Sequence, residues 1–232
     1  MRHNDSEVVR MVVLGATGGT GRAVVEAALR AGHTVTAVTR RADALPPAPG
    51  LTVEVIPDLA LPGPALPDLP LPEPAPLSPA DERLADAVAG HDAVVSALGP
   101  SARGPATVCA DGIRSTLRAM KTTGVRRLVV VSAHGAAESR DRSPYSLALW
   151  ASVGSKMRDK EAMEALIRAS DTDWTIVRPP ALRDTAPTGR YRTGTDLRIR
   201  LTTAVSRADL ADFIVKETVE PAYLRRAPRI AS

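Results

Sequence analysis

Along this chain, short apolar runs alternate with longer segments in which apolar residues recur with helical spacing. The apolar runs have the length of buried strands and are bounded by glycine, proline or polar residues. They predict strands at residues 8–14, 33–39, 51–56, 93–98, 126–131 and 174–177. The other segments predict helices at residues 23–31, 78–89, 107–123, 145–170 (in two pieces around Gly154) and 206–219. This alternation is typical of an α/β fold with a doubly wound parallel sheet and right-handed crossovers.

Two stretches interrupt the alternation within what we expect to be a single domain, residues 1–232. Residues 57–79 contain nine prolines, which excludes a helix or a central strand and predicts an inserted surface loop. Two interpretations stay open: a lid or partner-docking segment, or an insertion tolerated because long loops add little closure entropy. Residues 179–203 form an irregular region on the substrate side, a small C-terminal substrate-binding region, and a short hairpin is predicted within residues 181–203. Residues 229–231 predict an edge strand.

The turn between the first strand and the first helix is rich in glycine. The apolar run ends at Gly15, and helical spacing begins at Ala23. Gly15 permits a tight turn, Gly18 lets the backbone approach a pyrophosphate, and Gly21 lets the helix pack close to the strand. The amides at the helix start, with the helix dipole behind them, form an anion site. The pattern predicts a dinucleotide-binding turn and a Rossmann-type sheet, with an ordinary glycine-rich turn as the alternative.

Arg40 and Arg41 stand at the end of the second predicted strand. Sites that prefer NAD(H) carry an Asp or Glu at this place, which accepts hydrogen bonds from the ribose hydroxyls. A guanidinium group instead suits a 2′-phosphate. The two arginines therefore favour NADP(H) over NAD(H), and the alternative is a charged strand end that faces water.

The composition argues against several classes of function. The formal net charge is +4 and the pI about 9.6, but the basic residues are scattered and form no nucleic-acid-binding pattern. No apolar run is long enough for a membrane span, and the polar N-terminus lacks a signal-peptide pattern. Cys109 is the single cysteine, so neither a disulfide nor a structural metal site is expected. We expect a cytoplasmic protein that binds no nucleic acid, membrane or metal.

Several stretches of the chain carry a family resemblance. GATGGTGR at 15–22, DAVVSALG at 92–99 and GVRRLVVVS at 124–132 resemble the atypical short-chain dehydrogenase/reductases. DWTIVRPP at 173–180 looks like the segment that follows the long helix in NmrA-like members. TGRY at 188–191 and VSRADLAD at 205–212 are similar to the flavin reductase (biliverdin reductase B) branch. The resemblance covers nearly the whole chain apart from the proline-rich stretch and the termini.

The resemblance implies NAD(P)H binding and assigns residues to the cofactor by position. The glycine turn would hold the pyrophosphate, Arg40 and Arg41 the 2′-phosphate, and Lys160 would lie near the nicotinamide ribose. Asp58 and Leu59 would flank the adenine. The complete expected set is Gly15, Thr17, Gly18, Gly19, Thr20, Gly21, Arg40, Arg41, Asp58, Leu59, Ala97, Leu98, Gly99, Ser132, Ala133, Lys160 and Pro179.

The catalytic residues of the family are incomplete in this chain. Members with the full set use a Ser, a Tyr and a Lys four residues after the Tyr. Tyr145 follows Ser132 at a familiar interval, but position 149 is Leu, and a phenol without a nearby ammonium is a poor acid–base group at neutral pH. His134 is a further candidate, since imidazole titrates near neutrality, unless it is an exposed loop residue.

The catalytic candidates are therefore Ser132, His134, Tyr145 and Lys160, and each also has a purely structural interpretation. Ser132 is expected to donate to a substrate oxygen or to the carboxamide, or else to satisfy backbone at a strand end. Lys160 is expected to fix the cofactor, with Glu164 one helical turn later as its ion-pair partner.

The resemblance implies an NADPH-dependent oxidoreductase that transfers hydride to a small aromatic, quinone-like, flavin-like or carbonyl acceptor. The missing Tyr-Lys pair and the proline-rich stretch also suit two alternatives. One is a non-catalytic NADP(H)-binding redox sensor, and the other is an isomerase or cyclase that retains its cofactor. The sequence predicts a small-molecule substrate but names neither that substrate nor the oligomeric state.

Overall fold

The computed structural model of the protein describes residues 7–57, 59, 77–99, 107–141 and 143–232. Asp58 and most of the proline-rich stretch, residues 60–76, lie outside the described residues. The predictions made for them therefore stay predictions.

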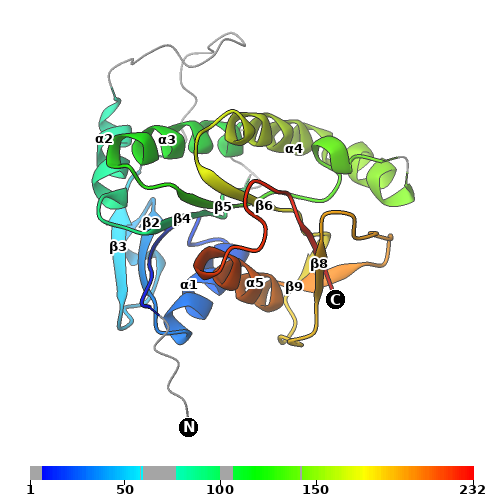
Figure 1. Ribbon diagram of the computed structural model, residues 1–232, viewed down its shortest axis with the longest axis horizontal. Coiled ribbons are helices and arrows are strands. Elements are labelled where there is room, and N and C mark those ends of the chain that lie inside the picture. The colour runs from blue at the N-terminus through cyan, green and yellow to red at the C-terminus, as the bar shows by residue number, and fades with distance from the viewer. Residues whose placement is uncertain (1–6, 58, 60–76, 100–106, 142) are drawn as a thin grey trace.

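In the described part of the chain, a central sheet of six parallel strands has the order β3-β2-β1-β4-β5-β6 (Figure 1). The strands are β1 (Arg10–Leu14), β2 (Thr34–Thr39), β3 (Leu51–Val55), β4 (Ala93–Ser96), β5 (Arg127–Val131) and β6 (Asp173–Val177). All six were predicted from the apolar runs. The strand order reverses between β1 and β4, and doubly wound sheets bind ligands at the carboxyl edge beside such a point.

Helices cover both faces of this sheet (Figure 1). One face carries α2 (Pro79–Val88), α3 (Val108–Thr123) and α4 (Pro144–Arg168), and the other carries α1 (Gly19–Arg30) and α5 (Arg207–Val219). The predicted break in α4 is confirmed, because Val153 has non-helical backbone angles. The start predicted for α1 at Ala23 is wrong: the glycine turn itself forms the first helical turn, so α1 begins at Gly19.

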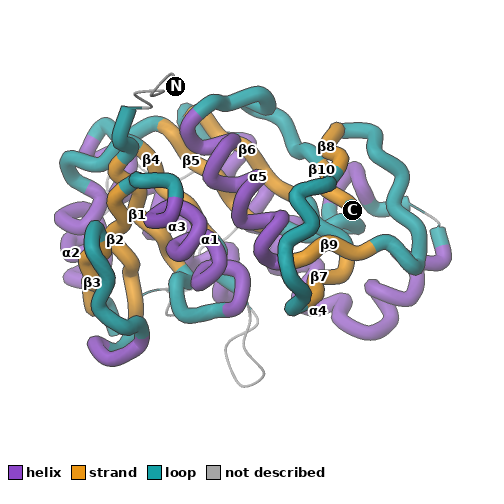
Figure 2. The backbone as a smooth tube through the Cα atoms, turned by 90° about the horizontal axis from the view of Figure 1, so that it is seen from below, coloured by secondary structure: helices purple, strands orange, loops and turns teal. Residues whose placement is uncertain are grey.

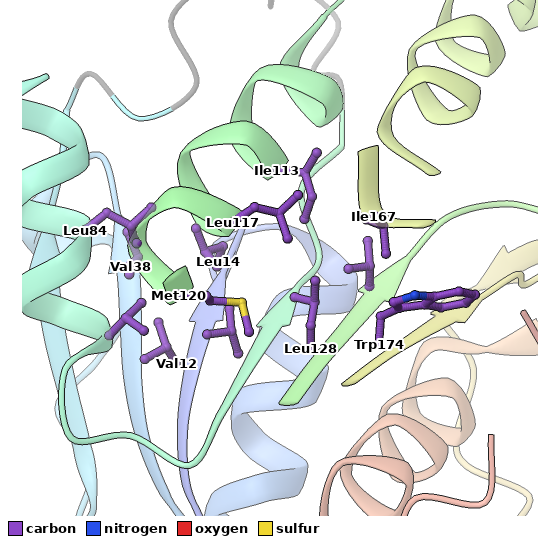
Figure 3. Close-up of a cluster of buried hydrophobic side chains, with 14 of the residues drawn as sticks. Val12, Leu14, Val38, Leu84, Ile113, Leu117, Met120, Leu128, Ile167 and Trp174 are labelled. Atoms are coloured by element: carbon purple, nitrogen blue, oxygen red, sulfur yellow. The ribbon is translucent and has the colours of Figure 1, made fainter. Parts of the chain in front are cut away.

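The core lies in two layers, one on each face of the sheet. Val12 and Leu14 of β1 join the cluster under α2, α3 and α4, whereas Met11 and Val13 point to the opposite face and join the cluster under α1 and α5. Figure 3 shows the first of these clusters, with Val12 and Leu14 among the helix side chains. Because both faces are covered, each strand reads as a continuous apolar run rather than an alternating one.

The C-terminal part adds two small sheets beside α5 (Figure 2). They contain β7 (Ala181–Arg183), β8 (Arg192–Gly194), β9 (Ala204–Ser206) and β10 (Arg229–Ala231). The hairpin predicted between residues 181 and 203 is wrong, since β7 pairs in parallel with β9 and β8 pairs antiparallel with β10. These pairings join segments that are distant in the sequence, which local turn signals do not reveal.

Candidate dinucleotide and substrate site

The glycine turn has a geometry that requires glycine at two positions. Gly15 has a φ of +73°, and a Cβ there would lie 2.7 Å from the carbonyl oxygen of Ala97. A Cβ on Gly21 would lie 2.1 Å from the carbonyl oxygen of Gly15. The N–H of Gly18 donates to the carbonyl of Gly15 at 3.0 Å and closes the turn. The tight turn and the close approach of α1 to β1 are therefore those that the motif predicts.

The start of α1 is open to an anion. Gly18 is the N-cap residue, no described side chain caps it, and the first turn of α1 carries no acidic residue. Thr17, Gly18 and Gly19 are exposed. The first amides of α1 are thus available to a ligand, and the helix dipole favours a negatively charged one.

A pocket of about 470 Å³ opens beside the glycine turn and is lined by Thr17, Arg40, Arg41 and Ala44. The hydroxyl of Thr39 donates to the carbonyl of Arg41 at 2.8 Å and fixes the chain as it leaves β2. Both arginines are exposed. The structure therefore brings the two predicted phosphate-binding arginines to the glycine turn.

Arg22 supports this pocket, although the sequence assigned it no role. Its Nε donates to the carbonyl of Thr17 at 3.1 Å, and its Nη2 donates to the carbonyl of Ala44 at 3.3 Å. One guanidinium group therefore ties the glycine turn to the 3₁₀ turn Ala42–Ala44 on the other wall. The sequence shows Arg22 at the end of the glycine motif, but it does not reveal the hydrogen bond to the carbonyl of Ala44.

A buried network of charges lies beyond the ends of β5 and β6. Glu164 of α4 and Arg178 are almost completely buried. Arg178 Nε donates to Glu164 Oε1 at 3.0 Å, while its Nη2 donates to Glu164 Oε2 and, at 2.8 Å, to Glu138. Burial opposes the charge on Arg178, but the two carboxylates hold its pKa above the ordinary value. The Glu138 side chain is 59% exposed; partial burial opposes its charge, but the hydrogen bond from Arg178 lowers its pKa to about 2.

Ser132 and Lys160 are fixed by separate partners. The Ser132 hydroxyl donates its proton to Glu164 Oε1 at 2.6 Å, so this side chain can only accept further hydrogen bonds. The expectation that it donates to a substrate is therefore wrong for this conformation. The predicted ion pair between Lys160 and Glu164 is also wrong, because Arg178 binds both oxygens of Glu164. Lys160 Nζ instead donates to the carbonyl of Val131 at 3.2 Å.

His134 is buried, so the interpretation as an exposed loop histidine is wrong. Its ring lies against Tyr145 with 5.3 Å between the centroids, and neither ring nitrogen has a hydrogen-bond partner among the described residues. Burial, with the cations Arg229 and Arg178, lowers the pKa of His134 to about 4. Burial also raises the pKa of the Tyr145 phenol. Neither group is therefore tuned for proton exchange at neutral pH.

The other predicted cofactor residues that the structure describes lie along the same edge. The backbone of Ala97 and Leu98 contacts the glycine turn, and Gly99 is exposed. The N–H of Ser132 donates to Val177 at 2.8 Å, two residues before Pro179, and ties the ends of β5 and β6 together. Leu59 packs against the core cluster rather than lining the arginine pocket, so its contact with an adenine stays a prediction.

The described residues contain no cluster of three or more side chains that could hold a metal ion, and none of their helices is long and apolar enough to cross a membrane. Cys109 is buried, and burial raises the pKa of its thiol to about 12. It is therefore inert as a nucleophile at neutral pH.

Comparison with known proteins identifies the family. Residues 15–59 and 76–221 match the model of a family described as NAD(P)H-binding. The chain belongs to this NAD(P)H-binding family. The match leaves out residues 60–75, which fall within the proline-rich stretch. The family accounts for the open anion site of α1 and for the glycines that a Cβ would obstruct, since both fit a dinucleotide cofactor.

A curated relative, the UPF0659 protein YMR090W of Saccharomyces cerevisiae, is 30% identical over 147 residues, which is 60% of this chain. The match spans 61% of that relative's own length.

Several solved structures share the fold over almost the whole chain. The oxidoreductase ylbE of Lactococcus lactis has a TM-score of 0.76 at 16% identity, covering 95% of this chain and 90% of that one. ChuY, an anaerobilin reductase from Escherichia coli O157:H7, has a TM-score of 0.72 at 23% identity, covering 95% and 96%. A Rossmann-fold NAD(P)-binding family protein from Shigella flexneri has a TM-score of 0.65 at 20% identity, covering 96% and 93%. At these identities the likeness confirms the predicted Rossmann fold alone.

Proposed function

We propose that the protein is an NADPH-dependent oxidoreductase that transfers hydride to a small aromatic, quinone-like, flavin-like or carbonyl acceptor. The observation that carries the cofactor choice is the pocket in which Arg40 and Arg41 stand beside the glycine turn. Its described lining holds no carboxylate to accept from ribose hydroxyls, whereas guanidinium groups suit a 2′-phosphate. The reductase assignment is supported by the resemblance of the motifs and by ChuY, a structure of the same fold that is named a reductase.

In this proposal the residues beyond β5 position the reactants. When bound, NADPH supplies the hydride. Ser132, whose proton is held by Glu164, offers lone pairs that accept a hydrogen bond from a carboxamide N–H. Lys160 donates one hydrogen bond to Val131 and has two further N–H donors for ribose hydroxyls. Catalysis then comes mainly from holding the hydride donor and the acceptor in contact.

The proton that accompanies hydride transfer comes from solvent in this proposal. Tyr145 is a poor donor because burial raises its pKa, and His134 is neutral at pH 7 because burial lowers its pKa. The neutral imidazole carries one donor and one acceptor without described partners, but both ring nitrogens are buried, so His134 is assigned no substrate contact in this proposal.

A second proposal is an NADP(H)-binding redox sensor that performs no turnover. It is supported by the absence of an activated acid: Leu149 occupies the position of the family lysine, and the pKa of Tyr145 is raised. A sensor binds both redox forms of the cofactor and consumes neither. An isomerase or cyclase, by contrast, converts its substrate without net loss of NADPH.

Consumption of NADPH, followed by absorbance against a panel of flavins, quinones and small carbonyl compounds, tests the first proposal. A reductase consumes NADPH with at least one of them, and Arg40→Ala raises KM for NADPH with little change in kcat. Arg126→Ala is the matched control, since it removes an exposed arginine that precedes β5, at the amino ends of the strands and away from the site. Binding of NADPH without consumption by any acceptor favours the sensor, and absence of binding contradicts both proposals.

A further inference from the structure

An arginine from outside the glycine motif lies against the start of α1. Arg207 is the first residue of α5, and α1 and α5 pack against each other on one face of the sheet (Figure 2). A Cβ built on Gly19 would lie 2.9 Å from Nε and 3.1 Å from Cδ of Arg207. The arginine therefore occupies the space that a side chain at position 19 would need. The VSRADLAD stretch thus contributes a cation beside the glycine turn.

The charge of Arg207 is weakly compensated. Its Nη1 lies 2.6 Å from Oδ1 of Asp184, but the Asp184 side chain is 82% exposed, and such exposed ion pairs contribute little stability. The guanidinium also stands at the positive end of the α1 dipole, an unfavourable place for a cation unless an anion is present. No acidic residue in the first turn of α1 provides that anion. Arg207 therefore stands where an anion bound at the start of α1 would meet its guanidinium group.

We propose that Arg207 binds the pyrophosphate of NAD(P)H and gives up Asp184 when the cofactor binds. The proposal rests on the glycine turn being the cofactor site of the proposed function. Phosphate oxygens accept charge-assisted hydrogen bonds from a guanidinium that are stronger than an exposed carboxylate pair. Because the pyrophosphate is common to both cofactors, Arg207 serves NADPH and NADH alike. Arg40 and Arg41 serve only the 2′-phosphate.

The segment that follows β7 stays attached to α5 when Arg207 exchanges Asp184 for the pyrophosphate. Asp209 of α5 is buried and accepts hydrogen bonds from the N–H groups of Thr188 at 3.0 Å and Gly189 at 2.9 Å. These bonds hold the segment after β7 on α5 independently of Arg207. Asp184 is therefore the exchangeable contact, and cofactor binding frees a carboxylate at the edge of the substrate-side residues 179–203.

Equilibrium titration of the full chain with NADPH, NADH and adenosine 2′-monophosphate tests the proposal. Arg207→Ala is expected to weaken both dinucleotides about tenfold and to leave adenosine 2′-monophosphate unchanged, since that ligand has no pyrophosphate. Arg40→Ala is expected to weaken NADPH and adenosine 2′-monophosphate but not NADH. Asp184→Asn is expected to tighten both dinucleotides about twofold, because it removes the competing carboxylate. Arg126→Ala controls for the loss of one positive charge.

The outcomes distinguish a failure of the Arg207 inference from a failure of the proposed function. Unchanged affinity for both dinucleotides in Arg207→Ala overturns the inference and leaves the proposed function standing. An effect on NADPH alone reassigns Arg207 to the 2′-phosphate and also overturns it. A wild-type chain that binds neither dinucleotide contradicts the proposed function itself. If Arg207→Ala does not fold, Arg207→Lys replaces it, because lysine keeps the positive charge. Arg207→Lys is expected to bind both dinucleotides a few-fold more weakly than the wild type. The inference is overturned if Arg207→Lys binds both dinucleotides with wild-type affinity and Asp184→Asn binds them more weakly than the wild type.

Discussion

The two halves of the candidate site are built in opposite ways. At the ends of β1 and β2, exposed backbone amides and the guanidinium groups of Arg40 and Arg41 present positive charge with no acidic residue in the first turn of α1. At the ends of β5 and β6, Arg178 is buried against Glu164 and Glu138, so its charge is already matched within the protein. The first half is suited to binding a charged ligand, and the second to holding side chains rigidly in place.

The largest expected effect is on the buried ion pair of the second half. Arg178→Met is expected to lower the free energy of unfolding by about 3–5 kcal/mol, because it leaves Glu164 buried without its main partner. Urea unfolding with fitted m-values measures this. Arg126→Met, at an exposed pair, is the control and is expected to cost about 1 kcal/mol or less.

The double variant Arg178→Met/Glu164→Leu sharpens this test. Removing both charges leaves no buried unpaired ion, so most of the lost stability is expected to return. If the single and the double variants are equally unstable, the loss comes from packing rather than from an uncompensated charge.

The next largest effect is expected at the first half, from Gly21→Ala. The added methyl group would lie 2.1 Å from the carbonyl oxygen of Gly15, so α1 must move away from β1. We expect a loss of about 3 kcal/mol, as for other overpacked sites, and a large loss of NADPH affinity. Gly99→Ala is the stability control, since its methyl group would meet nothing within 4 Å of the described residues. Wild-type stability and affinity in Gly21→Ala would mean that close packing at the turn is not required.

A smaller effect is expected from pH at His134. Its pKa falls from 6.5 to about 4 on folding, so between these values the unfolded chain binds more protons. Stability is therefore complete above pH 6.5 and decreases as the pH falls, by about 1.4 kcal/mol per pH unit at most.

Unfolding free energies at pH 6.5 and pH 5 measure this dependence. Over that interval the ionisation of Glu138 and Asp141, whose pKa values are near 2 in the folded chain, contributes less. The wild type is expected to lose about 1.5 kcal/mol and His134→Gln almost none. Equal losses in both proteins would place the titrating group elsewhere.

The same contrast explains how far the sequence predicts this molecule. The six strands and the glycine turn were predicted from local signals, because apolar runs and glycine spacing depend on residues that are close in the sequence. Arg40 and Arg41 were found because they follow β2 directly. The glycine turn and these two arginines come from two short segments of chain, and the structure places them together.

The second half depends on contacts between distant segments, and there local reasoning failed. Glu164 was assigned to Lys160 because they lie one turn apart on α4, but the fold brings Arg178 to it from the end of β6. The burial of His134 has the same origin, and so does the approach of Arg207 to Gly19 in the first half of the site. No periodicity or spacing encodes them, since each results from the packing of whole elements.

Titration of the wild-type chain and Arg40→Ala with NADPH and NADH tests the central claim most directly. The account predicts that the wild type binds NADPH at least about tenfold more tightly than NADH, because the charge-assisted bonds of Arg40 to the 2′-phosphate are available only to NADPH. It also predicts that Arg40→Ala removes most of this difference. Equal affinities in the wild type, or no binding of either cofactor, would contradict it.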